Sequence, residues 1–110
     1  MALIVKTENP EGLLIEIKRA IDAKEVDLWS YDESGDFSYT PDEWINRAWL
    51  RPETGDGELR LGILGTNDEG MTASLYSIYH SQFIDMLLTY FDHFYTTVAA
   101  TAKKTAPDFF

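Results

Sequence analysis

Residues 71–102 most constrain how this chain can fold, because they contain neither proline nor glycine over a stretch long enough for one long helix. Placed at about 100° per residue, the large apolar side chains of this stretch spread over an arc of about 220°. A helix that rests on a single sheet needs an apolar arc of about 100°. The sequence therefore predicts a long C-terminal helix whose apolar surface is wider than one sheet covers.

Two interpretations account for this wide arc. In the first, the sheet covers one side of the helix and an N-terminal helix covers another. In the second, the excess face packs against a second copy of the chain, because aromatic residues are frequent at the centres of protein interfaces. We expect a homodimer, and the candidate interface consists of Tyr76, Tyr79, Phe83, Leu87, Tyr90, Phe91 and Phe94.

The N-terminal part of the chain predicts a shorter helix. Asn9-Pro10-Glu11 has the order expected of a helix start, because asparagine caps free amides and proline suits the first helical position. Apolar residues then recur at helical spacing, which predicts an amphipathic helix over about 10–24. Ahead of it, residues 2–7 are suited to a short strand or an extended leading segment.

Two hairpins are predicted between the helices. Aromatic-rich runs flank the turn DESGD at 32–36, and the turn GDG at 55–57 separates two further runs with strand character. Between the hairpins, Thr40-Pro41-Asp42-Glu43 matches a capping box and predicts at most two helical turns.

The order helix, strands, helix predicts an α+β fold. We expect an antiparallel sheet of about four strands over residues 26–65, flanked by the short N-terminal helix and packed on the long C-terminal helix. Residues 1–102 are predicted to form a single domain, and residues 103–110 a flexible C-terminal tail.

Net charge narrows the range of partners. Aspartate and glutamate total 19 against 9 lysines and arginines, and the formal net charge is −10. Because phosphate backbones and anionic lipids repel such a surface, we expect no nucleic-acid or membrane binding.

The chain contains no cysteine, which excludes disulfides and thiolate catalysis. The N-terminus lacks the pattern of a signal peptide, and we expect a soluble cytoplasmic protein.

The stretch YDESGDFSYTPDEW at 31–44 contains five carboxylates and no lysine or arginine. Four of its residues match ligand positions of a calcium loop, but Phe37 stands where that loop needs glycine. His80 and His93 would lie about 20 Å apart on one helix. We therefore expect no metal site.

The candidate acidic partner face, with aromatic residues between the acids, consists of Asp32, Glu33, Asp36, Asp42 and Glu43. The alternative is a solvated hairpin whose aromatic side chains face the core.

No catalytic or cofactor-binding motif occurs in the sequence, and we assign no catalytic residue and no cofactor. The leading hypothesis is a small acidic, homodimeric protein–protein interaction module without identifiable catalytic activity. One alternative is an acidic inhibitor or immunity-type protein that binds a basic protein. The other is a small-ligand binder or enzyme with a pocket between the sheet and the long helix, lined by Trp44, Trp49, Tyr79 and Phe83.

Overall fold

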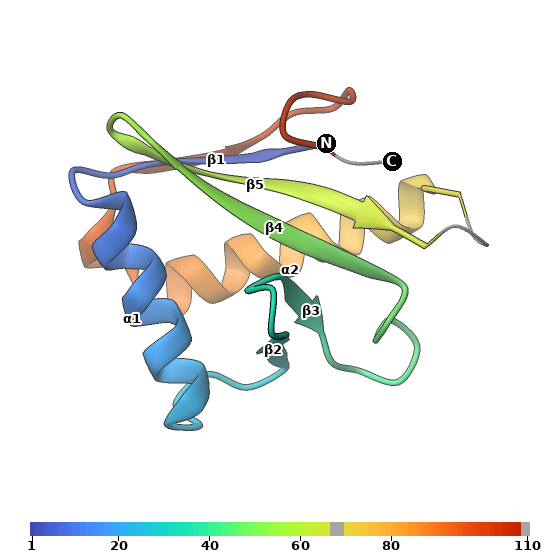
Figure 1. Cartoon of the computed structure of the whole chain (residues 1–110), viewed down its shortest axis with the longest axis horizontal. Coiled ribbons are helices and arrows are strands. Elements are labelled where there is room, and N and C mark those ends of the chain that lie inside the picture. Colours follow the sequence, from blue (N-terminus) through green and yellow to red (C-terminus); the bar gives the residue numbers. More distant parts are fainter. Residues whose placement is uncertain (67–69, 109–110) are drawn as a thin grey trace.

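The computed structural model describes residues 1–66 and 70–108 and has an α+β fold built on one antiparallel sheet (Figure 1). Within these residues the sheet has six strands in the order β2-β3-β4-β5-β1-β6. The strands are β1 (Leu3–Lys6), β2 (Trp29–Tyr31), β3 (Phe37–Tyr39), β4 (Ala48–Gly55), β5 (Glu58–Gly65) and β6 (Thr97–Ala100). The predicted α+β class with an antiparallel sheet and two helices is confirmed. The prediction of about four strands over 26–65 is wrong, because β1 and β6 extend the sheet beyond β5.

The first helix, α1 (Pro10–Asp22), begins where the sequence predicts it. Asn9 Oδ1 accepts a hydrogen bond from the amide of Gly12 at 3.0 Å, and Pro10 occupies the first helical position. The helix buries Leu13, Ile17 and Ala20 and contacts β2, β4 and β5.

One face of the sheet carries the core. Leu3 of β1 lies opposite Leu61 of β5, and Leu50 of β4 lies opposite Ile63 of the same strand. All four side chains are buried. Since alternate side chains of a strand share a face, these residues define the inner face of the sheet, which α1 and α2 (Ala73–Tyr90) cover. From α2, the buried side chains are Leu75, Tyr79, His80, Phe83, Met86 and Leu87.

The prediction of one helix over 71–102 is only partly confirmed. The helix α2 begins after Thr72, whose side chain accepts a hydrogen bond from the amide of Leu75, and it ends at Tyr90. Phe91 leaves the helical conformation with φ −131°, and the chain continues into the 3₁₀ turn η1 (Asp92–Phe94) and into β6. Pairing with β6 satisfies the backbone groups on one side of β1, which explains why a strand forms there.

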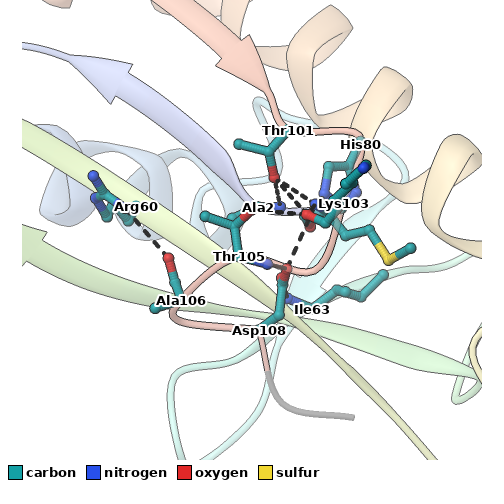
Figure 2. Close-up of polar contacts among 10 residues, drawn as sticks. Ala2, Arg60, Ile63, His80, Thr101, Lys103, Thr105, Ala106 and Asp108 are labelled. Carbon is teal, nitrogen blue, oxygen red and sulfur yellow. Dashed lines mark hydrogen bonds and ion pairs between the residues drawn. The ribbon is translucent and has the colours of Figure 1, made fainter.

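Residues 101–108 return across the end of β1 to the outer face of β5 (Figure 2). The Asp108 carboxylate accepts hydrogen bonds from the amides of Ile63 at 3.0 Å and Thr105 at 2.8 Å. Gly62 leaves room for this segment, because a Cβ atom there would lie 2.1 Å from the carbonyl oxygen of Pro107. The flexibility predicted for 103–110 stays a prediction, and its last residues, 109–110, lie outside the described residues.

Candidate protein interaction site

The strand β6 forms one edge of the sheet, and its backbone orientation is fixed by β1. The amide of Thr101 donates to the carbonyl of Ala2 at 2.9 Å. Hydrogen-bonded pairs alternate along an antiparallel ladder, so Thr97 and Ala99 also direct their backbone groups to β1. The N–H and C=O groups of Val98 and Ala100 consequently point to the free edge. Backbone groups of this kind are a template for pairing with another strand.

The sequence of β6 contains none of the residues that usually protect a sheet edge. Such edges are ordinarily blocked by charged side chains or by proline, whereas β6 reads TVAA. The opposite edge strand, β2, has Asp27 before it and Asp32 and Glu33 after it. Antiparallel pairing of two β2 strands would therefore bring like charges together. Of the two edges, β6 is the one better suited to pair with a further strand.

An apolar surface of α2 lies beside the free edge. A groove of about 340 Å³ separates Tyr76, His80 and Ile84 of α2 from residues 100–102 at the end of β6. Leu88 follows Ile84 on the same side of the helix, one turn later, and its side chain is 54% exposed. A strand that pairs with β6 would pass directly beside this helix surface.

His80 connects this part of α2 to the start of β1 (Figure 2). Its side chain is 4% exposed, and its Nε2 atom is hydrogen-bonded to the carbonyl oxygen of Met1. Because a carbonyl only accepts, Nε2 carries a proton and donates. Burial lowers the pKa of His80, against an opposing effect of the Met1 carbonyl. The imidazole therefore acts as a neutral cross-link between the helix and the sheet.

The predicted interface residues fall into two groups. Four of them, Tyr79, Phe83, Leu87 and Phe91, are buried in the core of a single chain. Their surfaces are covered by the chain itself, which the aromatic pattern of the sequence does not reveal. The other members lie at the surface: Tyr76 is half-buried at the groove beside β6, and Tyr90 and Phe94 are exposed near the end of α2. The homodimer itself stays a prediction.

Asp36 of the predicted acidic face is buried and forms an ion pair with Arg51. Asp36 is 4% exposed, and its two carboxylate oxygens accept hydrogen bonds from Arg51 Nε at 3.0 Å and Nη2 at 2.8 Å. Asp32 Oδ1 accepts from the amides of Ser34 and Asp36 and so shapes the turn. The carboxylates of Asp32, Glu33, Asp42 and Glu43 lie in exposed residues, and a partner for them stays a prediction.

The predicted pocket residues do not share a face of the sheet. Tyr79 and Phe83 are buried on the inner face, whereas Trp49 alternates with the buried Ala48 and Leu50 and so lies on the outer face. The ligand-binding alternative stays a prediction. In the part of the chain that the structure describes, no group of three or more histidine, aspartate or glutamate residues is placed to hold a metal ion.

No protein-family model, no curated protein and no solved structure matches the chain. None of the helices in the ranges 1–66 and 70–108 is long and apolar enough to cross a membrane.

Proposed function

We propose that the protein is a protein–protein interaction module that acts as a homodimer, in which the β6 strands of two copies pair antiparallel. The observation that carries the proposal is the free edge of β6, an uncharged strand with outward-facing backbone groups. Strand pairing would join the two sheets into one, and it would satisfy these groups without rearrangement of either copy.

The two-fold symmetry of such a dimer restricts its register. Hydrogen bonds between the two strands can form only between residues whose backbone groups point to the free edge, which are Val98 and Ala100. When all of these groups are used, Val98 pairs with Ala100 of the partner subunit. Ala99 then lies opposite Ala99 of the partner subunit in a non-hydrogen-bonded pair. The two-fold axis is perpendicular to the sheet in this arrangement, and both α2 helices lie on the same side of it.

Apolar contacts and charge both support this arrangement. Ile84 of α2 lines the groove beside Ala100, and the exposed Leu88 follows it one helical turn later, so pairing of the strands would bring two apolar helix surfaces towards each other. Asp92 precedes β6 and Lys103 follows it, and both residues are exposed. Antiparallel pairing places the acidic end of one strand near the basic end of the other, which favours association at both ends.

Sedimentation of a proline variant tests the proposal. The amide of Ala100 faces the free edge, so Ala100→Pro should remove an intermolecular hydrogen bond and place the ring where the partner strand would lie. We expect the wild-type protein to associate to a dimer over a concentration series, and the variant to stay a folded monomer with an unchanged circular dichroism spectrum.

Ala99→Pro is the matched control, because the amide of Ala99 faces β1 and its loss should damage the fold itself. A wild-type protein that stays monomeric throughout the series would refute the homodimer. A variant Ala100→Pro that dimerises as strongly as the wild type would refute β6 as its interface.

A further inference from the structure

A second surface, distinct from the β6 edge, lies between α1 and η1 at the end of the molecule where α2 finishes (Figure 1). It consists of two hollows of about 540 and 300 Å³ that share Glu16, His93 and Phe94. The larger hollow extends along the first half of α1 to Thr7 and Asn9, and the smaller extends past the second half of the helix. We call the two hollows together the α1–η1 groove.

Large apolar side chains of the groove are exposed to solvent. Ile15 is 66% exposed, Tyr90 45% and Phe94 38%. Phe94 lines both hollows, Ile15 lines the larger one and Tyr90 the smaller one, so each hollow has two exposed apolar side chains. Exposed apolar side chains that gather in a hollow are typical of an interaction site. The ring of Phe94 lies beside those of Phe91 and His93, with centroids 6.2 and 4.2 Å away, so its exposed face belongs to an aromatic cluster.

The rim of the groove is acidic. Its lining includes Glu8, Glu16 and Glu25 and one basic residue, Arg19, which forms ion pairs with Glu16 at 3.0 Å and with Glu25 at 3.1 Å. Asp92 adds a further acid directly before His93, and Glu8 and Asp92 are both exposed. An apolar floor beneath a negative rim is complementary to a positively charged segment with apolar side chains.

We propose that the α1–η1 groove is a docking surface for a lysine- or arginine-rich protein segment that inserts an apolar side chain beside Phe94. A second copy of the chain fits this groove poorly, because a symmetric contact would place Glu8 and Asp92 against the same acids of the partner subunit. The groove therefore provides a binding site for a different protein, and β6 stays free to pair in the presence of that partner.

Peptide titrations test this proposal with defined probes. The probes are three synthetic peptides of equal length that repeat Lys-Leu, Glu-Leu and Lys-Ser. Backbone amide shifts in NMR spectra of the full chain should change at Ile15, Glu16 and Phe94 with the Lys-Leu peptide. We expect no change with Glu-Leu, weaker binding with Lys-Ser, and a loss of affinity for Lys-Leu as the salt concentration rises.

Variants of the exposed apolar residues Ile15 and Phe94 show whether the peptide binds in the α1–η1 groove. Ile15→Ala combined with Phe94→Ala should weaken Lys-Leu binding about tenfold or more, because anchor residues dominate binding energy. Leu88→Ala is the control, since Leu88 is an exposed apolar residue (54%) that does not line the groove. The double variant should not change sedimentation, so this test is independent of the homodimer.

Three outcomes would overturn the docking surface. They are no binding of the Lys-Leu peptide, shift changes centred on residues 32–43 instead of the groove, and equal affinity in the double variant and the wild type.

Discussion

Asp36 and His80 are both 4% exposed, but they differ in their hydrogen-bond partners. Asp36 is held by two hydrogen bonds from Arg51, which compensate the burial of its charge. His80 has a backbone carbonyl as its partner, and none of the carboxylates that the structure describes lies at hydrogen-bond distance from it. Burial therefore favours the neutral imidazole, and the pKa of His80 is lowered.

The lowered pKa of His80 predicts that acid destabilises the fold. Below the ordinary histidine pKa of about 6.5, the unfolded chain binds a proton that folded His80 does not bind. The free energy of unfolding should consequently fall as the pH drops below that value. We expect that His80→Gln reduces this dependence relative to the wild type, measured by urea unfolding at a series of pH values on both sides of pH 6.5.

His93→Gln is the control for the His80 prediction, because the side chain of His93 is 70% exposed. Burial lowers the pKa of His80 most; among the described charged groups, the Met1 ammonium also lowers it and Asp108 raises it, while the backbone carbonyls of Met1 and Tyr76 raise it. The assignment would be wrong if His93→Gln reduced the pH dependence as much as His80→Gln does.

Single residues with local effects could be interpreted from the sequence, whereas contacts between distant residues could not. The acidic stretch 31–44 predicts its own turn correctly, since Asp32, Ser34 and Gly35 act on their immediate neighbours. The pairing of Asp36 with Arg51 joins two different strands and has no local signal. The burial of Tyr79 and Phe83 has no local sequence signal either, because an aromatic side chain suits a core and an interface equally well.

At the level of elements, the segments predicted correctly are those whose signals are local. The cap at Asn9 fixes the start of α1, and Gly57, with φ +71°, closes the β4–β5 hairpin at the predicted turn. The capping box at 40–43 gives only a turn, in which the amide of Ile45 donates to the Pro41 carbonyl at 3.0 Å. Asn46, with φ +62°, then prevents a helix from continuing.

The strand β6 could not be predicted from its own residues. Ala99 and Ala100 are good helix formers, and the absence of proline and glycine extends the helical pattern through them. The strand exists because Thr97–Ala100 pair with Leu3–Lys6, at the opposite end of the sequence. Such tertiary pairing overrides local propensity, and it also removes Phe91, Phe94 and Val98 from the predicted helix surface.

The contact between the C-terminal segment and β5 predicts a strong effect of Gly62→Ala. The added Cβ atom would lie 2.1 Å from the Pro107 carbonyl, which is rigid backbone, so the segment 106–108 must move away. We expect a loss of about 1–3 kcal/mol in the free energy of unfolding. Trypsin should also cleave faster after Lys103 and Lys104.

Gly55→Ala is the control for this substitution, because its Cβ would make an ordinary contact of 3.6 Å with the Glu58 side chain. If Gly62→Ala and Gly55→Ala are cleaved at the same rate, residues 106–108 do not pack on β5 as described.

For the molecule as a whole, the absence of cysteine makes the proposed dimer directly testable by cross-linking. In the register that pairs Val98 with Ala100 of the partner subunit, the two Ala99 Cα atoms lie about 4.5 Å apart, within the range that a disulfide spans. We expect Ala99→Cys to form a covalent dimer under mild oxidation, visible on a non-reducing gel.

Thr54→Cys serves as the control for random collision, since Thr54 is exposed in β4 and away from the β6 edge. Equal cross-linking of the two variants would show that the disulfide reports collisions and would contradict the register.

The position of β1 has a further consequence for how the chain reaches its native state. Leu3 pairs with Leu61 on one side and with Ala100 on the other, so this strand is completed only by partners that are synthesised much later. Contacts between such distant residues give a high contact order and slow folding. A ribosome-bound chain would therefore hold β1 without its second neighbour until translation has passed β6, and the sheet could be completed only after that point.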